Sequence, residues 1–401
     1  MVPFEDMKQE QENFDKVAMN EKYLKKDIIS TKNVKSIQFA KPYFQFSAAC
    51  AGCAETTYIK LVSQLFGDRL YVGNAAGCSS AISGGAPILP YCKDCQGHGP
   101  AWEHSLFEDN AEFAYGFFHA QDAIRKELLI RLDAIKAAGI AVEAVEAYEN
   151  GWKDSSKSRA VTDALLSALE KAEQTKDVKY VLANREFLAK KSVWAIGGDG
   201  WAYDIGYGGI DHVMAQNQNV NLLVLDTEVY SNTGGQSSKA TPVGAVAQFQ
   251  ASGKKTKKKD LGMLMMTYDN VYVAQCSMGA DPAQLIKAIR EAEAHKGPSI
   301  VICYAPCINH GIKKGMGCVQ QEMKDAVASG YWNLYRYSPE THKFTLDSKE
   351  PSMALYDFMK GEVRYSSLEL SFPENAKVLF AEAEDAAKAK YESYKRRAED
   401  Q

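Results

Sequence analysis

Between residues 190 and 310, short apolar runs alternate with helix-like segments, and this alternation limits the possible folds more than any other feature. Apolar runs at 193–196, 220–225, 271–274 and 299–303 predict strands. Residues 281–292 predict a helix, with Asp281 as the N-cap and Pro282 at the first helical position. Strands and helices that alternate in this way form a parallel sheet covered on both faces. The sequence therefore predicts an α/β fold with a doubly wound, mostly parallel sheet and helices on both faces.

The flanking segments suggest three parts. Residues 1–37 are polar and rich in lysine and glutamate, which is typical of an N-terminal arm or linker. Residues 38–345 hold the α/β alternation, a predicted helix at 61–66, a predicted strand at 69–72 and a helical stretch at 104–175. Residues 346–401 form a C-terminal extension whose Ala-, Lys- and Glu-rich tail predicts a helix.

Composition narrows the class of protein. The 401 residues are 46% hydrophobic, enough for a large core, and the net charge of −4 argues against a nucleic-acid binder. No apolar stretch is long enough to span a membrane, and the acidic N-terminus is typical of neither a signal nor a transit peptide. Nine cysteines without a signal peptide indicate a reducing compartment, so we expect a cytoplasmic protein whose cysteines bind metal or do redox work.

Two of the predicted strands end in polar turns, at Gly198-Asp199-Gly200 and at Asp226-Thr227. The carboxyl ends of neighbouring parallel strands open into one crevice, which is where such folds bind ligands. Glycine lets the backbone approach a diphosphate closely, and a carboxylate such as that of Asp199 suits magnesium. The turns therefore favour a magnesium-diphosphate cofactor over a nicotinamide.

Two other interpretations of these turns are a glycine-rich turn without a ligand and a nucleotide-binding Rossmann turn. The Rossmann pattern requires Gly-x-Gly-x-x-Gly and an acidic residue that ends the second strand. Residues 198–200 lack that pattern, and Asp226, the best candidate for the acid, is followed at once by the second polar turn. The Gly-Asp-Gly turn and the second turn instead resemble those of thiamin-diphosphate enzymes. That resemblance implies that Asp199, Thr227 and the Val229 carbonyl hold magnesium, with Thr227 replacing the more usual asparagine as an oxygen donor.

The cysteines form a second constellation. Cys50 and Cys53 make a C-x-x-C pair, and Cys78 follows as a third cysteine after a further 24 residues. Thiolates suit iron–sulfur clusters or zinc, and a cluster needs four ligands. The spacing does not choose the fourth, for which the candidates are Cys92, Cys95, Cys276, Cys303, Cys307 and Cys318.

Several motifs resemble the pyruvate:ferredoxin (flavodoxin) oxidoreductase family, in its C-terminal thiamin-diphosphate domain with the cluster nearest the cofactor. They lie at residues 50–56, 77–80, 99–102, 105–110, 197–243 and 304–311. The resemblance extends from about residue 38 to about 375. It implies a fold of the thiamin-diphosphate-binding type, and it assigns both the cofactor and the cluster to residues 38–345.

The resemblance also implies roles for individual residues. The ligands of one [4Fe-4S] cluster would be Cys50, Cys53, Cys78 and Cys307, with zinc or free thiols as the alternatives. Asn232 would be the catalytic residue beside the substrate, close to the reactive carbon of the cofactor. The residues around thiamin diphosphate and Mg²⁺ would be Glu55, Cys78, Gly198, Asp199, Gly200, Trp201, Thr227, Glu228, Val229, Tyr230, Ser231 and Asn232.

The implied reaction is the oxidative decarboxylation of a 2-oxo acid with coenzyme A, which yields acyl-CoA and carbon dioxide (EC 1.2.7 type). Pyruvate is the expected substrate because residues 230–242 resemble the pyruvate branch, and ferredoxin or flavodoxin would accept the electrons in anaerobic electron transport. The resemblance reaches only the C-terminal part of the family. The pyrimidine-binding and two-cluster parts would lie on other chains, or the sequence is a fragment, and the full assembly would be a homodimer. Alternatives are a non-oxidative thiamin-diphosphate decarboxylase or synthase, a related 2-oxo acid:ferredoxin oxidoreductase beta component, and a non-catalytic cluster-carrying subunit.

The remaining cysteines call for separate expectations. Cys92 and Cys95 form a second C-x-x-C, which would be either a redox dithiol or second metal site, or two incidental loop thiols. We expect the incidental thiols because no further ligands lie nearby. Cys276 and Cys303 lie in or next to predicted strands, so we expect them to be core thiols.

The lysine-rich run and the histidines indicate less about function than the cysteines do. The lysine-rich run 254–259 could guide an acidic ferredoxin or meet coenzyme A phosphates, but we expect a solvated loop. His98 and His310 lie near site motifs and His212 follows the first polar turn. We assign none of them a catalytic role.

Overall fold

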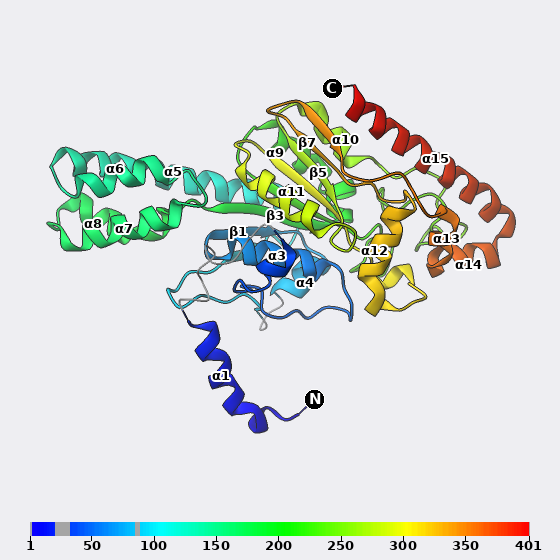
Figure 1. Ribbon diagram of the computed structural model, residues 1–401, viewed down its shortest axis with the longest axis horizontal. Helices are drawn as coiled ribbons and strands as arrows, with labels where there is room; N and C mark the ends of the chain where they lie inside the picture. Colours follow the sequence, from blue (N-terminus) through cyan, green and yellow to red (C-terminus); the bar gives the residue numbers. More distant parts are fainter. Residues whose placement is uncertain (1, 21–32, 85–88, 401) are drawn as a thin grey trace.

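The computed structural model describes residues 2–20, 33–84 and 89–400, and an eight-stranded sheet lies at its centre (Figure 1). The strand order is β2-β1-β3-β4-β6-β5-β7-β8. The six strands from β2 to β5 in this order are parallel, whereas β7 pairs antiparallel with β5, and β8 with β7. The predicted mostly parallel α/β fold is confirmed. The strands are β1 (Leu70–Asn74), β2 (Ala101–His104), β3 (Ser192–Gly198), β4 (Asn221–Asp226), β5 (Tyr272–Cys276), β6 (Ser299–Tyr304), β7 (Tyr335–Ser338) and β8 (Lys343–Leu346).

The four central strands are apolar because both faces of the sheet are covered. Every residue of β4, β5 and β6 is buried, and in β3 only the last residue is partly accessible. Such strands read as continuous apolar runs, which is why all four were predicted from sequence. Helix α5 (Asn110–Ala137) packs on β1 and β3 with α9 (Tyr207–Ala215) beside it. Helices α10 (Leu261–Met265) and α11 (Pro282–Ala294) pack on β5 and β6.

Local capping agrees with the sequence at the start of α11. The Asp281 carboxylate accepts hydrogen bonds from the backbone N–H groups of Ala283 and Gln284, and Pro282 is the first helical residue. On the N-terminal side, α2 (Val34–Ile37) packs on α3 (Glu55–Phe66), and α4 (Cys78–Gly84) packs on β2 and β3. Helix α3 is longer than the predicted 61–66 segment and begins directly after the C-x-x-C pair.

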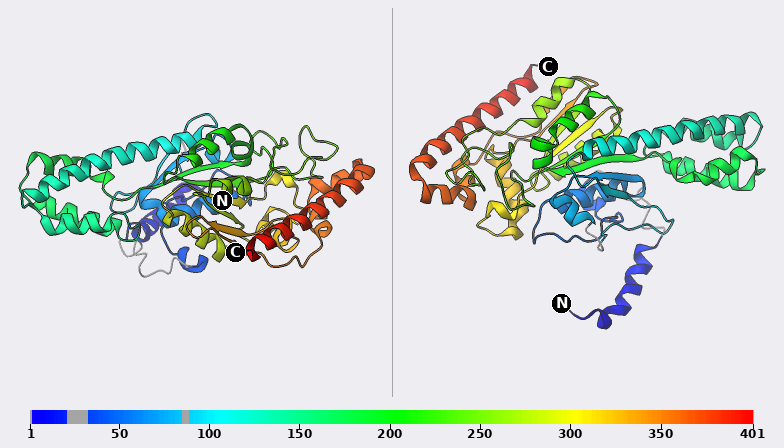
Figure 2. Two further views of the ribbon diagram at one scale, coloured as in Figure 1. Left: turned by 90° about the horizontal axis from the view of Figure 1, so that it is seen from above. Right: turned by 180° about the vertical axis from the view of Figure 1, so that it is seen from behind.

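A helical arm projects from one edge of the sheet (Figures 1 and 2). It consists of the distal part of α5 together with α6 (Val142–Gly151), α7 (Ser158–Lys171) and α8 (Lys176–Ala183). The arm has a hydrophobic core separate from the main one, and its buried members are Leu128, Leu132, Ile135, Val145, Tyr148, Leu165, Leu169, Val178, Val181 and Leu188. The helical periodicity at 104–175 therefore belongs to two places: the start of α5 packs on the sheet, and the rest of α5 with α6 and α7 shares the core of the arm.

The C-terminal segment wraps the opposite end of the sheet (Figure 1). It comprises α12 (Val319–Ala328), the β7–β8 hairpin, α13 (Leu355–Lys360), α14 (Val363–Ser371) and α15 (Pro373–Glu399). The predicted helical tail is confirmed as α15, which packs on β8. The Tyr394 ring lies 5.0 Å from that of Tyr335 and 5.8 Å from that of Phe344, so the tail belongs to the main core.

The N-terminal segment contains α1 (Lys8–Ala18), an exposed helix that stands away from the sheet (Figure 1). Residues 21–32 of the expected arm lie outside the described residues. Ile37, at the end of that expected arm, is fully buried in the main core. Among the described residues, no helix combines the length and hydropathy that a membrane crossing requires.

Candidate functional site

The two polar turns meet at the carboxyl edge of the sheet. Strands β3 and β4 are parallel neighbours, and their register pairs Gly198 with Leu225. Asp199 therefore emerges beside the turn that begins at Asp226. After Asp199 the chain forms a π-helix, η5 (Gly200–Ile205), a rare conformation that is frequent at functional sites. The sheet register alone brings two segments that are distant in sequence into one crevice.

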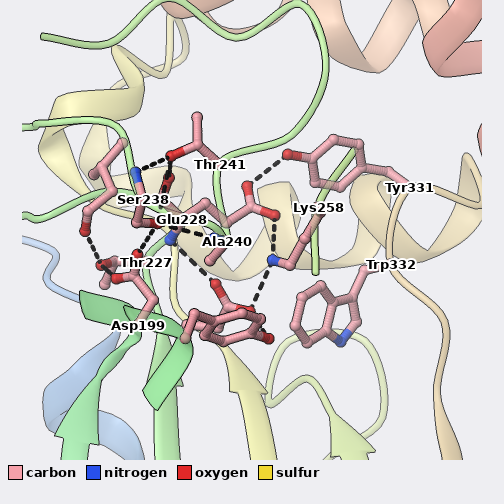
Figure 3. Close-up of polar contacts among 12 residues, drawn as sticks. Asp199, Thr227, Glu228, Ser238, Ala240, Thr241, Lys258, Tyr331 and Trp332 are labelled. Carbon is pink, nitrogen blue, oxygen red and sulfur yellow. Dashed lines mark hydrogen bonds and ion pairs between the residues drawn. The ribbon is translucent and has the colours of Figure 1, made fainter. Parts of the chain in front are cut away.

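The three atoms expected to hold magnesium lie together. The Thr227 hydroxyl oxygen is 2.9 Å from an Asp199 carboxylate oxygen and 3.0 Å from the Val229 carbonyl oxygen (Figure 3). A hydroxyl has one hydrogen and can donate to only one of these acceptors. Oxygen ligands on adjacent corners of a magnesium octahedron are about 3 Å apart, given bonds of about 2.1 Å. The donor set and its spacing therefore fit Mg²⁺.

Asp199 is almost completely buried and has no basic partner within ion-pair distance among the described residues. Its two carboxylate oxygens accept hydrogen bonds from Thr227, at 2.9 Å, and from the Ser238 hydroxyl, at 2.6 Å (Figure 3). Burial and the nearby negative charge of Asp226 raise the pKa of Asp199 to about 8. A divalent cation would supply the positive charge that this carboxylate lacks.

A small cavity of about 80 Å³ opens beside the two turns. It is lined by ten of the predicted site residues: Glu55, Cys78, Gly198, Asp199, Gly200, Trp201, Val229, Tyr230, Ser231 and Asn232. The nearest atom to a Cβ built on Gly198 is 3.9 Å away, so the glycine leaves space for a ligand. At Gly200 a Cβ would lie 2.4 Å from the Tyr230 ring, so the close packing of the two turns requires glycine there.

Two of the predicted cofactor-binding residues, Thr227 and Glu228, do not line this cavity. Thr227 is not a lining residue, but its hydroxyl oxygen lies 2.9 Å from a carboxylate oxygen of Asp199, which does line the cavity. The Glu228 carboxylate points away, towards Lys258 and Tyr331 (Figure 3). It lines a different cavity, of about 390 Å³, between the sheet and α15. The structure thus places Glu228 behind the turn, where it supports the backbone and does not face the smaller cavity.

Two carboxyl groups of the small cavity have an unpartnered buried oxygen: Glu55 and Glu108. Burial raises the pKa of Glu55 to about 7, and burial together with the charge of Asp109 raises that of Glu108 to about 7. Each can therefore give or accept a hydrogen bond near neutral pH. Glu108 was missed as a site residue, although the segment 105–110 was among the motifs of the family resemblance.

The four expected cluster cysteines come from three segments of the chain that approach the same cavity. Burial and the negative charges of Glu55, Cys307 and Cys50 raise the pKa of Cys78 to about 12. Burial and Glu55 raise the pKa of Cys53 to about 12, with Cys307 as a further contributor. The four thiols are therefore close enough to influence one another electrostatically, and four soft donors suit an iron–sulfur cluster. Within the described residues, no three His, Cys, Asp or Glu side chains are arranged to hold a single metal ion.

Cys78 belongs to both parts of the site. It lines the small cavity, and its sulfur is 3.3 Å from the Ser231 hydroxyl oxygen and 4.0 Å from the amide oxygen of Asn232. Asn309, two residues after Cys307, donates to the Cys307 sulfur at 3.6 Å and to the Ser231 carbonyl at 3.4 Å. The thiols and the second polar turn are thus in direct contact.

The other cysteines are distributed as follows. Cys276 and Cys303 are fully buried and occupy paired positions on β5 and β6, which confirms them as core thiols. Cys92 is half-buried, with its sulfur 3.8 Å from the Pro42 carbonyl oxygen, and Cys95 is also half-buried. The interpretation of these two as incidental loop thiols stays a prediction. Cys318 is half-buried. The nearby Met316 backbone packs against Gly52 of the first C-x-x-C so closely that a Cβ at Gly52 would clash with the Met316 carbonyl oxygen.

The expectation of a solvated loop at 254–259 was wrong for three of its lysines. Lys254 is buried and donates to the Ser238 carbonyl, and Lys259 donates to the Tyr203 carbonyl at 3.1 Å. The Lys258 ammonium lies 2.7 Å from Asp226 and 3.0 Å from Glu228. The physical reason is that two buried carboxylates at the second polar turn need counter-charges, which a run of lysines does not reveal by itself.

Comparisons with known proteins find relatives that use thiamine pyrophosphate or are named as pyruvate oxidoreductases. Residues 180–303 match the family described as the thiamine pyrophosphate enzyme, C-terminal TPP binding domain. The chain is 54% identical over 381 residues to the pyruvate:ferredoxin oxidoreductase of Moorella thermoacetica, covering 91% of this chain and 32% of that protein. It is 49% identical over 372 residues to the pyruvate-flavodoxin oxidoreductase of Klebsiella pneumoniae, covering 90% of this chain and 32% of that protein.

A solved structure of a 2-oxoglutarate:ferredoxin oxidoreductase from Magnetococcus marinus is 15% identical, with a TM-score of 0.38. The match covers 71% of this chain and 80% of that chain. The chain spans about a third of the length of the curated relatives it matches.

Proposed function

We propose that this chain forms the thiamin-diphosphate- and cluster-binding part of an oxidoreductase. It is homologous to about a third of the pyruvate:ferredoxin and pyruvate-flavodoxin oxidoreductases. The reaction is the oxidative decarboxylation of a 2-oxo acid, with pyruvate as the first candidate and coenzyme A as the acyl acceptor. Ferredoxin or flavodoxin takes the electrons. The observation that carries the proposal is the position of Cys78, which lines the diphosphate cavity and lies close enough to Cys50 and Cys307 for their charges to raise its pKa.

The residues of the crevice have distinct tasks in this proposal. Asp199, Thr227 and the Val229 carbonyl hold Mg²⁺, and Gly198 leaves space for the diphosphate. Bound thiamin diphosphate supplies the carbanion chemistry of decarboxylation. The amide of Asn232, at the mouth of the cavity, orients the substrate.

The cysteines supply the electron exit. Cys50, Cys53, Cys78 and Cys307 hold one [4Fe-4S] cluster beside the diphosphate cavity. The contacts of Cys78 with Ser231 and Asn232 join the cluster ligands to the cofactor turn. This adjacency favours an oxidative reaction over a non-oxidative decarboxylase, which has no use for an electron acceptor beside its cofactor.

Exposed apolar side chains on segments next to the crevice favour the proposal that a partner domain packs there. Leu106 and Phe107, which precede Glu108, are 72% and 71% exposed, and Phe249 is 88% exposed. Leu106 and Phe249 have left-handed backbones, with φ of 70° and 67°, which costs bulky residues energy. We call Leu106, Phe107, Phe249, Ile205 and Ile308 the apolar rim. In the proposal the rim contacts the pyrimidine-binding domain that completes the active site.

The test begins with anaerobic purification of the chain together with its partner domains. We expect a brown protein that contains iron and acid-labile sulfide and that reduces ferredoxin or viologen when given pyruvate and coenzyme A. The Asp199→Asn variant should keep its iron but lose thiamin diphosphate and activity. A colourless protein that decarboxylates pyruvate would support the non-oxidative alternative instead. Iron without any thiamin diphosphate binding would support a non-catalytic cluster carrier.

A further inference from the structure

A network of buried charges lies directly behind the magnesium turn. It consists of three carboxylates and three basic side chains, which are Asp226, Glu228 and Glu362 with Lys258, His310 and Arg364. All except Lys258 are less than a tenth exposed, and the Lys258 side chain is 16% exposed. We call these six residues the charged network. Buried charges are expensive, so a network of this size needs a reason beyond filling space.

Glu228 connects the network to the turn. It lies between Thr227 and Val229, the two residues of this turn that provide magnesium ligands, and it has a left-handed backbone with φ of 61°. A glutamate in this conformation costs energy and persists only when its surroundings hold it there. The backbone is held by Thr241, whose hydroxyl donates to the Glu228 carbonyl at 2.6 Å (Figure 3).

The Glu228 carboxylate is held even more firmly. Lys258 lies 3.0 Å from one oxygen, and the other accepts hydrogen bonds from Arg364 at 2.7 Å and from the Tyr331 hydroxyl at 2.5 Å. The carboxylate is therefore held by three donors that come from three different segments of the chain.

A second connection reaches the turn through Thr227. The Nε2 atom of His310 is 2.7 Å from the Thr227 carbonyl oxygen, and its Nδ1 atom is 3.2 Å from the Glu362 carboxylate. A carbonyl oxygen only accepts, so Nε2 carries a hydrogen. Glu362 also accepts from Arg364 at 2.7 Å, and Arg364 returns to Glu228. The network thus forms a closed loop of contacts that holds the turn at two points, the Thr227 carbonyl and the Glu228 carboxylate.

Two of the gripping residues come from the C-terminal segment. Glu362 immediately precedes α14 and Arg364 lies in its first turn, far in sequence from the β4 turn that they hold. We propose that Arg364, Lys258 and His310 are positioning residues that set the Thr227 hydroxyl and the Val229 carbonyl against Asp199 for magnesium binding. This inference rests on the proposed magnesium-diphosphate function. It predicts that weakening the grip raises the magnesium concentration needed for cofactor binding.

The experiment titrates thiamin diphosphate into the full chain at a series of Mg²⁺ concentrations and follows the fluorescence of Trp201, which lines the cavity. The variants are Tyr331→Phe, which removes one hydrogen bond to Glu228 and keeps every charge, and Arg364→Lys, which keeps the charge and loses the planar fork. The control is Lys257→Met, which changes an exposed lysine next to Lys258 that forms no ion pair with the network carboxylates in the described part of the chain. Thermal unfolding without ligands is measured for each variant.

We expect the half-saturating Mg²⁺ concentration to rise about threefold or more for Tyr331→Phe and about tenfold or more for Arg364→Lys, as the loss of one neutral or one charged hydrogen bond would give. The control should match the wild type.

If the wild type binds no thiamin diphosphate at any Mg²⁺ concentration, the proposed function fails. If the wild type binds and the folded Arg364→Lys variant has an unchanged Mg²⁺ requirement, the positioning inference fails although the function stands. A lower melting temperature with unchanged Mg²⁺ dependence would mean that the network serves folding alone, and would also overturn it.

Discussion

The Thr227 hydroxyl lies 2.9 Å from the Asp199 carboxylate, although the two residues follow different strands and are 28 positions apart. The contact exists because β3 and β4 are parallel neighbours in a fixed register. A shift of one residue between these strands would separate the two oxygens by about 3.3 Å along the strand direction. The cofactor crevice is therefore a product of the sheet register, and the buried apolar side chains of both strands maintain it.

The oxygen of Thr227 is the most direct test of the magnesium site. Thr227→Val keeps the shape of the side chain but removes the hydroxyl, so we expect Mg²⁺-dependent binding of thiamin diphosphate to weaken about tenfold or more. Thr227→Ser keeps the oxygen and should stay within about threefold of the wild type. Calorimetric titration measures both variants, and equal affinities for Val and Ser would exclude the hydroxyl as a ligand.

The cluster assignment makes a prediction for individual cysteines. Changing Cys50, Cys53, Cys78 or Cys307 to alanine should reduce bound iron and sulfide well below the content of about four irons per chain that one cluster gives. Cys92→Ala and Cys95→Ala are the matched controls and should keep the full content. Iron and sulfide analysis after anaerobic purification measures this. A loss of iron in either control variant would show that the second C-x-x-C provides a ligand.

Glu322 should make stability depend on pH. Burial, with the charge of Glu362 as a second cause, raises its folded-state pKa from 4.5 to about 7. Between these values the folded state holds a proton that the unfolded state has released, so stability falls as pH rises from about 4.5 to about 7. Glu322→Gln removes this loss. The difference in unfolding free energy between the variant and the wild type should therefore be about 2 kcal/mol more favourable to the variant at pH 8 than at pH 5.

Denaturant unfolding at the two pH values measures the effect of Glu322. The matched control is Glu392→Gln, an exposed glutamate on α15 that should change stability equally little at both pH values. A Glu322→Gln variant with the same pH profile as the wild type would show that this carboxyl is ionised without cost in the folded protein.

The helical arm should unfold without affecting the cofactor site. Leu132 is fully buried in the arm's own core, so Leu132→Ala should destabilise the arm by about 2–5 kcal/mol. Hydrogen exchange should then speed up in α6, α7 and α8, whereas thiamin diphosphate affinity should stay unchanged. Leu223→Ala, in the centre of β4, is the contrasting variant and should impair both. Faster exchange throughout the sheet in Leu132→Ala would contradict the independence of the arm.

Phe249 should lower the stability of the isolated chain and strengthen its association with the partner domain. Its side chain is 88% exposed and its backbone is left-handed, so Phe249→Gly should stabilise the isolated chain by about 1 kcal/mol. The same change removes part of the apolar rim and should weaken association with the partner domain. Ile130→Ser, an exposed position on the arm, is the control and should leave association unchanged. Sedimentation with the partner domain and thermal unfolding of the chain alone measure the two effects.

The central fold could be predicted from sequence because four strands are buried on both faces and are therefore continuous apolar runs. Strands β2, β7 and β8 were missed because each has only four residues and is incompletely buried, so none is a continuous apolar run. The oxygen and cysteine motifs were recognisable since their residue types are tied to particular chemistry. The charged network was not, because Lys258 lies in an ordinary basic run and Arg364 lies in no motif at all. Their roles depend on partners that only the folded chain brings together.

The separate core of the helical arm has a consequence for the evolution of this chain. A unit that buries its own apolar residues can gain or lose whole turns at its far end while the part of α5 that packs on the sheet stays the same. Helix α5 has 28 residues and is about 42 Å long, so it carries the arm's far end well beyond the sheet. Insertions and deletions should therefore concentrate between α5 and β3, where selection can reshape contacts with other proteins while the chemistry stays the same.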